Sequence, residues 1–186
     1  MTASIPQPLP LVTDRLRLRQ HATEDVEPLQ RIYGRPDVSR FLLEEPWTLE
    51  AAERNVHERL SRNDLEGSNG ALSLVIALDD ATIGDVQLWF TDRERRVAEI
   101  GWVLDPHHGG RGLAAEAVSE VLRFAFESAR LHRVTAQMDA RNTASAKLAE
   151  RVGMRREAHL RQDWWSKGEW TDTVIFGMLE TDRAYF

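Results

Sequence analysis

A glycine-rich loop between a predicted strand and a predicted helix is the segment of this sequence best suited to bind a ligand. The strand covers residues 97–104, the loop follows as HHGGRG over residues 107–112, and the helix begins near Leu113. Glycine lets the backbone come close to a ligand, and the first turn of a helix offers free N–H groups at the positive end of its dipole. The loop therefore suits a phosphate or pyrophosphate group.

Two common phosphate-binding loops do not fit this segment. A Walker loop would continue with lysine and then serine or threonine, whereas Leu113 and Ala114 follow Gly112. A dinucleotide-binding fingerprint would need a third glycine or alanine, and an acidic strand end about 20 residues further on. That fingerprint is also expected near the start of a chain, whereas this loop follows several predicted strands. A turn with a purely structural role stays open as the alternative.

Other polar and aromatic residues carry weaker chemical signals. His107 and His108 are adjacent in the loop, with no second histidine or carboxylate at metal-ligand spacing, so we expect no metal site. Glu44, Glu45 and Trp47 would suit a cationic amine, although an exposed acidic turn is the simpler interpretation. Three tryptophans near the end either line a pocket, form a dimer contact or cover the core: Trp164, Trp165 and Trp170.

The elements that position these residues are predicted from hydrophobic periodicity and capping signals. Strands are expected over residues 11–20, 71–78, 83–90, 97–104 and 133–138, helices over 23–33, 48–60, 113–128 and 143–151, and a long hairpin at the end. The order β-α-α-β-β-β-α-β-α-β-β predicts an α/β fold. Its central mixed, mostly antiparallel sheet is flanked by helices on both faces, in a single domain over residues 1–186.

The composition argues against several classes of protein. A formal charge of −6 and a pI near 5.5 argue against nucleic acid as a partner and weakly favour amine-bearing partners. The lack of cysteine excludes disulfides, thiolate metal sites and a cysteine nucleophile, and fits a reducing cytosol. The first ten residues do not resemble a signal peptide, and no apolar run approaches the ~20 residues of a membrane helix. We expect a soluble, cytoplasmic protein with no membrane partner.

The glycine loop resembles the acetyl-CoA loop of the GNAT superfamily of N-acetyltransferases. The family pattern is Arg/Gln-x-x-Gly-x-Gly/Ala, which residues 107–112 match except that His107 replaces Arg or Gln. Because the family contacts the pyrophosphate mainly through backbone N–H groups, this departure matters little. Four segments in register are similar to the RimJ/RimL-like branch of ribosomal-protein N-terminal acetyltransferases: Asp105 to Ala117, Thr13 to Arg19, Asn142 to Ser145 with Gly153-Met154, and Asp172 to Leu179.

This resemblance implies the GNAT fold and an enzyme that transfers the acetyl group of acetyl-CoA to a primary amine. Without a cysteine nucleophile, direct attack by the amine in a ternary complex is the natural route. Acetyl-CoA is expected as co-substrate, with no metal. The resemblance places its contacts on one stretch and one helix cap: Val103, Leu104, His108, Gly109, Gly110, Arg111, Gly112, Leu113, Ala114 and Asn142.

The resemblance also implies two catalytic residues. Glu99 lies on the strand before the loop, where better-known GNAT enzymes keep a catalytic glutamate, and is the candidate base, acting through water. Ser145 stands where many GNAT enzymes use tyrosine and the RimL-like branch uses serine, and is the candidate acid for the CoA thiolate. The structural alternatives are an exposed glutamate on a strand and a serine that caps a helix.

Several functions stay open from the sequence. The acceptor is a protein N-terminus or a small molecule, such as an amino acid, a polyamine or an aminoglycoside-like drug. A non-catalytic acetyl-CoA sensor or scaffold and an α/β nucleotide-binding module are the alternatives from other classes. A homodimer is as open as a monomer.

Overall fold

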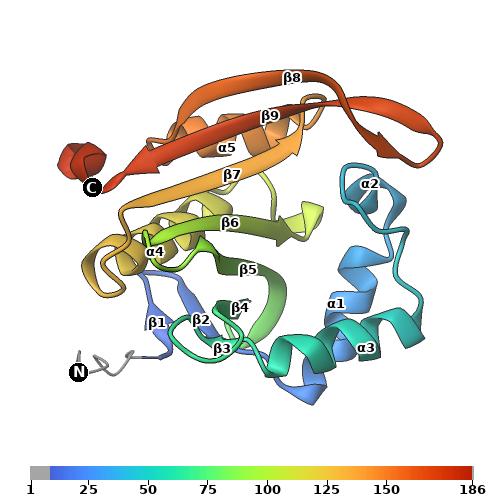
Figure 1. The fold of residues 1–186 in the computed structure, drawn as a ribbon. Coiled ribbons are helices and arrows are strands. Elements are labelled where there is room, and N and C mark those ends of the chain that lie inside the picture. Colours follow the sequence, from blue (N-terminus) through green and yellow to red (C-terminus); the bar gives the residue numbers. More distant parts are fainter. Residues whose placement is uncertain (1–8, 186) are drawn as a thin grey trace.

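The computed structural model describes residues 9–185, which form a nine-stranded sheet covered by helices on both faces (Figure 1). The strand order is β1-β2-β4-β5-β6-β7-β9-β8, with β3 paired to β4 beside this path. All neighbouring strands are antiparallel except β6 and β7. This confirms the predicted mixed, mostly antiparallel sheet. The strands are β1 Leu11–Val12, β2 Leu16–Gln20, β3 Asn63–Asp64, β4 Ala71–Leu78, β5 Ala81–Asp92, β6 Val97–Leu104, β7 Arg133–Asp139, β8 Arg155–Ser166 and β9 Glu169–Leu179.

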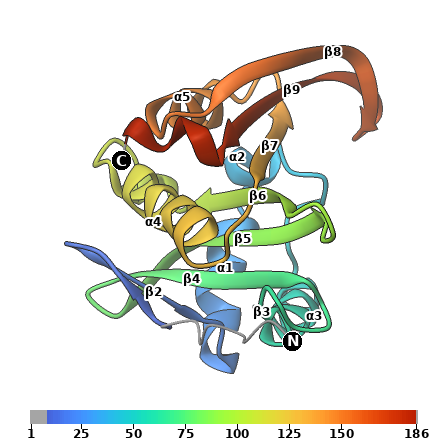
Figure 2. The same cartoon turned by 60° about the vertical axis from the view of Figure 1, so that its left-hand side comes forward.

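The helices divide between the two faces of the sheet. Figure 2 shows α4 in front of the sheet, with α1 and α3 behind it. The helices are α1 Val26–Tyr33, α2 Pro36–Ser39, α3 Leu49–Leu60, α4 Leu113–Glu127 and α5 Thr143–Arg151. None of those in the described part of the chain is long and apolar enough to cross a membrane.

Each face of the sheet has its own core. The apolar side of α4, including Val118, Val121 and Phe124, is buried against the strands because its apolar residues recur with the helical period. On the other face, Leu29 of α1 and Val56 of α3 pack in a smaller cluster that also includes Val103 of β6. The middle strands β5 and β6 are therefore fixed from both sides.

A side-chain cap and two tight turns fix the ends of several elements. The Thr48 hydroxyl accepts a hydrogen bond from the main-chain N–H of Ala51 at the start of α3. The β4–β5 turn has Asp79 and Asp80 at φ +48° and +63°, and the β8–β9 turn has Lys167 and Gly168 at φ +50° and +83°. Two successive positive φ angles are typical of two-residue hairpin turns.

The prediction of one strand over residues 11–20 is wrong. A turn at Thr13–Arg15 breaks it into β1 and β2, which pair antiparallel with Leu11 opposite Leu18. The Thr13 main-chain N–H closes the turn by donating to the Leu16 carbonyl at 3.0 Å. Side chains in this turn contact Glu116 on α4, and no local pattern reveals that partner.

The helix expected over residues 23–33 begins at Val26 rather than at Thr23. Thr23 lies inside a 3-10 turn that precedes α1, and the carboxylate of Asp25 accepts from the Ala22 N–H at 2.8 Å instead. Asp25 is held in this position by Arg19 of β2, which donates to both of its carboxylate oxygens. A tertiary ion pair has displaced the local capping preference.

Candidate active site

Strands β6 and β7 begin as a parallel pair and then separate. Their register runs only from Val97 opposite Arg133 to Glu99 opposite Thr135. Beyond Glu99, no strand within residues 9–185 pairs with β6 on the β7 side, so main-chain N–H and C=O groups there are free for another partner. The gap between the strands opens into two adjoining hollows.

The two hollows have similar sizes and share a wall. We call the first the loop cleft, of about 500 Å³, because residues of the glycine loop line it. We call the second the Glu99 cavity, of about 480 Å³. Both volumes lie in the range of small-molecule binding sites. The shared lining residues come from three separate segments: Phe41, Leu42, Trp102, Val103, Asn142 and Ser145.

The loop cleft contains all but one of the residues predicted to bind a cofactor. Val103, Leu104, His108, Gly109, Gly110, Gly112, Leu113, Ala114 and Asn142 line it. Arg111 does not line it, and its main-chain carbonyl accepts a hydrogen bond from Arg15. A charge from Arg111 beside a bound phosphate therefore has no support in this geometry.

The loop cleft has the features of an anion site. Gly110 and Gly112 have φ angles of +73° and +78°, which favour glycine, and a Cβ added to Gly110 would meet no heavy atom within 4 Å. Among the residues that the structure describes, no side chain caps the N-terminus of α4, so its first N–H groups are free for a ligand. The Nδ1 atom of His108 is buried without a hydrogen-bond partner among the described residues. A bound group with acceptor atoms would satisfy these donors.

Two cations of the loop cleft were missed by sequence reasoning. Lys147 and Arg151 lie one turn apart on α5 and both line the cleft. Neither forms an ion pair with another residue of the described chain. The sequence did carry a signal for them, because two basic residues at i, i+4 spacing after the Asn142 cap lie on the same face of a helix.

The turn before β2 holds the glycine loop from behind. Arg15 Nη1 donates to the Arg111 carbonyl at 3.0 Å, and Arg15 Nε donates to Glu116 Oε2 at 2.7 Å. The Thr13 hydroxyl and the Arg15 main-chain N–H both donate to Glu116 Oε1. Although burial opposes the charged form, these hydrogen bonds keep the pKa of Glu116 below its usual value. The loop and the first turn of α4 are thus both fixed by the side chain of Arg15.

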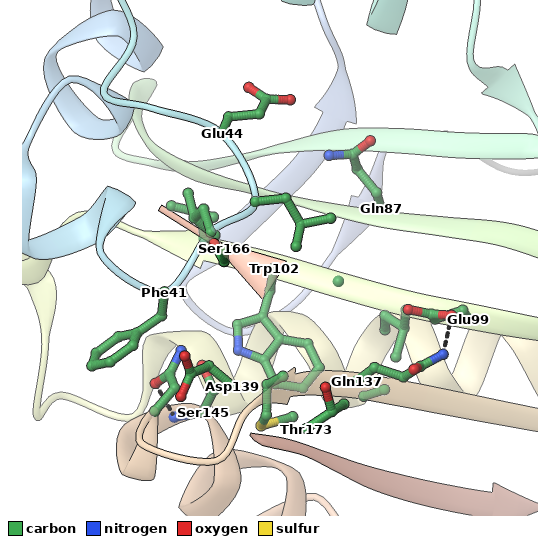
Figure 3. Close-up of a pocket in the computed structure, with 18 of the residues that line it drawn as sticks. Phe41, Glu44, Gln87, Glu99, Trp102, Gln137, Asp139, Ser145, Ser166 and Thr173 are labelled. Carbon is green, nitrogen blue, oxygen red and sulfur yellow. Dashed lines mark hydrogen bonds between the residues drawn. The ribbon is translucent and has the colours of Figure 1, made fainter. Parts of the chain in front are cut away.

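Glu99 is the central carboxylate of the Glu99 cavity. It is half-buried, and its Oε2 accepts a hydrogen bond from Gln137 Nε2 of β7 at 3.0 Å (Figure 3). Burial raises the pKa of the Glu99 carboxyl, and the hydrogen bond from Gln137 offsets only part of this effect. A half-buried carboxylate with a raised pKa is a better proton acceptor than an ordinary carboxylate.

Ser145 lies where the two hollows meet, and it lines both. In Figure 3 the Trp102 ring is drawn between Glu99 and Ser145. The Asn142 side chain accepts from the Ser145 main-chain N–H at 3.1 Å, which confirms that Asn142 is the N-cap of α5. The two candidate catalytic residues therefore border the same cavity, Glu99 from β6 and Ser145 from α5.

A buried charge network forms the floor of the Glu99 cavity, and sequence reasoning missed it. Asp85 accepts hydrogen bonds from the Tyr33 hydroxyl and the Arg59 guanidinium, and both of these side chains line the cavity. Next to Asp85 lies His21, which is fully buried and hydrogen-bonds to Ser73. Burial lowers the pKa of His21 to about 4, outweighing the opposite effect of Asp85.

Of the residues with weaker chemical signals, some line the Glu99 cavity and others lie in the core or on the surface. Trp47 is buried and stacks on Tyr33 with ring centroids 4.0 Å apart, so it belongs to the core. Glu44 lines the Glu99 cavity and accepts from the Trp47 indole N–H, whereas Glu45 does not line it. Of the three tryptophans in the last hairpin, Trp164 lines this cavity. The other two, Trp165 and Trp170, form an exposed edge-to-face pair outside it.

Metal-ligating side chains do not gather in the described part of the chain. Residues 9–185 contain no group of three or more histidines, aspartates or glutamates placed to hold a metal ion. His107 contacts Asp105 at 2.9 Å, but its side chain is 71% exposed, and no further ligand completes a site there.

The amino-acid sequence is similar to those of known acetyltransferases. Residues 15–155 match the family described as acetyltransferase (GNAT) domain. One relative is an uncharacterized N-acetyltransferase, p20, from Bacillus licheniformis. It is 31% identical over 174 residues, which cover 94% of this chain and 98% of the relative.

Solved structures share the fold. An acetyltransferase of the GNAT family from Bacillus anthracis superposes with a TM-score of 0.82 at 25% identity, covering 92% of this chain and 98% of that one. A spermidine N-acetyltransferase from Vibrio cholerae, in complex with CoA and spermine, gives 0.77 at 21% identity, covering 91% and 98%. RimL, a ribosomal L7/L12 alpha-N-protein acetyltransferase in complex with coenzyme A, gives 0.80 at 17% identity, covering 90% and 96%.

Proposed function

Because this chain belongs to the GNAT acetyltransferase family, we propose that it transfers an acetyl group from acetyl-CoA to a primary amine by direct attack in a ternary complex. The observation that carries the proposal is the junction of the two hollows. The loop cleft has the donors for a phosphate-bearing cofactor, and the Glu99 cavity has one half-buried carboxylate. They meet at Trp102, Val103 and Ser145.

The loop cleft fits acetyl-CoA, which supplies an activated acetyl group as a thioester. The free N–H groups at the start of α4 are donors for its pyrophosphate, and His108 adds a further donor when its Nδ1 carries the proton. Lys147 and Arg151 add positive charge on the facing side of the cleft. The unpaired edge of β6 at Val103 and Leu104 offers main-chain groups to the pantetheine arm.

Glu99 is assigned to remove the proton of the attacking amine. A lysine-like amine is an ammonium ion at neutral pH, with a pKa near ~10, so a base is needed before the nitrogen can attack. Glu99 faces the cavity and is held by Gln137, and it receives the proton through a bound water. Ser145, at the junction, is assigned to donate a proton to the departing sulfur. Because a thiol has a pKa near ~8.5, that second role contributes less.

The four sequence segments that resemble the RimJ/RimL-like branch support the proposal that the chain belongs to that branch. Both protein N-termini and small amines are acceptors compatible with the open Glu99 cavity. The cysteine-free composition fits a reducing compartment, and the proposal locates the enzyme in the cytoplasm. The alternative is a non-catalytic protein that binds acetyl-CoA as a sensor or scaffold. Glu99 and Ser145, both on the same cavity, favour the enzyme.

Two measurements on the same sample test this proposal. Acetyl-CoA at well above micromolar concentration should raise the melting temperature, because a ligand that binds only the folded state stabilises it. Incubation with acetyl-CoA and pooled primary amines should then release free thiol faster than either component does alone. A thermal shift without thiol release would identify a binding protein, and no shift would reject the cofactor assignment.

A further inference from the structure

The acceptor side of the site has an unusual combination of many aromatic rings and few unpaired carboxylates. Its aromatic and large apolar lining residues come from five segments: Phe41, Leu43, Trp89, Trp102, Met138 and Trp164. Resting on the proposed function, we infer that the acceptor has a single ammonium group on an aromatic or bulky apolar body, and that polyamines are poor acceptors.

The aromatic wall lies directly beside Glu99. Trp89 of β5 is the cross-strand partner of Glu99. Its ring extends over Gly101, where an added Cβ would meet the ring at 3.3 Å, and so a larger residue at this position would displace it. An amine that reaches Glu99 therefore has its body against Trp89, and an aromatic face also stabilises a nearby ammonium ion.

The mouth of the cavity is apolar as well. Leu43 and Trp164 line the cavity although their side chains are 70% and 48% exposed, and they come from the loop after α2 and from β8. The two segments are held together because Lys167, at the tip of the β8–β9 hairpin, donates to the Ser39 carbonyl of α2 (Figure 1). Exposed apolar side chains at the rim of a pocket gain stability only when a ligand with an apolar body covers them.

The charges of the lining oppose a second ammonium group. Asp139 is paired with Arg141 at 2.7 Å, and the charge of the exposed Glu44 acts on Arg59, another cation of the lining. This leaves Glu99 as the interior carboxylate available to a cation. Arg40 also lines the cavity and forms no ion pair with any residue of the described chain. Its charge would repel the far end of a polyamine.

Binding of three amines to the protein saturated with coenzyme A tests this inference. Calorimetry should show 2-phenylethylamine binding at least about tenfold more tightly than ethylamine, because even small apolar groups give discrimination of this size in a fitted pocket. Spermidine should bind no more tightly than ethylamine. Spermidine binding as tightly as 2-phenylethylamine would overturn the inference.

A pair of adjacent tryptophans provides the matched control. Trp164→Ala should weaken 2-phenylethylamine binding about tenfold and leave ethylamine unchanged. Trp165→Ala removes the same side chain from the outer face of the strand and should change neither. Equal effects of the two substitutions would contradict the inference. The proposed function has a separate readout: bound amines that are never acetylated would reject it alone, whereas preferred acetylation of spermidine would reject the acceptor class alone.

Discussion

The guanidinium of Arg15 donates to the main-chain carbonyl of Arg111 at 3.0 Å and forms an ion pair with Glu116 at 2.6 Å. One side chain from the turn before β2 thereby fixes both the glycine loop and the first turn of α4. The loop needs this contact because its three glycines are free to adopt many conformations. Arg15 lies outside the loop cleft and is a positioning residue.

Replacing Arg15 with alanine should weaken coenzyme A binding about tenfold, the effect of one lost charge-assisted hydrogen bond. Calorimetry measures it, and a rise in KM for acetyl-CoA with little change in kcat should accompany it. Arg123→Ala is the matched control, because Arg123 also pairs with a glutamate of α4, Glu120, but does not contact the loop. Equal affinities of the two variants would show that Arg15 does not position the loop.

Gly112→Ala should lose both stability and cofactor affinity. At φ +78° an alanine costs about 1–2 kcal/mol of unfolding free energy, and relaxation of the strained loop moves the N–H groups of the cleft. Gly168→Ala introduces the same strain at φ +83° in the β8–β9 turn, where an added Cβ meets no neighbour within 4 Å. The two variants should be destabilised alike in urea, but only Gly112→Ala should bind coenzyme A more weakly. A loss of affinity in both would point to global destabilisation instead.

Stability should fall with acidity through the buried His21. The pKa of His21 is 6.5 when unfolded and about 4 when folded, so only the unfolded chain gains a proton as pH falls below 6.5. The contribution is fully present above pH ~6.5 and declines toward pH ~4, reaching a loss of about 2 kcal/mol by pH ~5.

Urea unfolding at pH 7.5 and at pH 5 measures this loss. His21→Gln keeps a side chain that can hydrogen-bond to Ser73 and should remove most of the difference between the two pH values. His57→Gln, on the exposed face of α3, is the control and should behave as the parent protein does. An unchanged difference in His21→Gln would mean that other groups cause the acid sensitivity.

Local signals predicted the parts of the site that depend on neighbouring residues. The glycine loop with its positive φ angles, the Asn142 cap and the helical period of α4 all follow from short stretches of sequence. The parts that depend on distant residues were missed or misplaced. The contact of the Arg111 carbonyl with Arg15, 96 positions earlier, has no local signal in the sequence.

The buried network shows the same limit. Asp85, Arg59 and Tyr33 come from three different elements, and each alone has the sequence appearance of an ordinary strand or helix residue. Trp47 was a candidate acceptor contact, yet it stacks on Tyr33 and is buried. Such clusters become visible only when the sheet brings α1, α3 and β5 together.

The assignment of Glu99 as the base is the central chemical claim. It stands on the place of Glu99 in the cavity and on the burial that raises the pKa of its carboxyl. Because the base must be ionised, kcat/KM should rise with pH through this raised pKa. Ser145→Ala is the useful comparison, since it should cost less than Glu99→Gln and its cost should not depend on the pKa of the acceptor.

The most direct measurement is kcat/KM of Glu99→Gln with a primary amine from pH 6 to pH 9, together with its affinity for coenzyme A. The variant should bind coenzyme A normally and lose about 10²–10⁴-fold in kcat/KM at neutral pH, the usual contribution of general base catalysis. Part of that loss should return toward pH 9, because more of the acceptor is then already neutral. A rate equal to that of the parent protein across the whole range would contradict the assignment of Glu99 as the base.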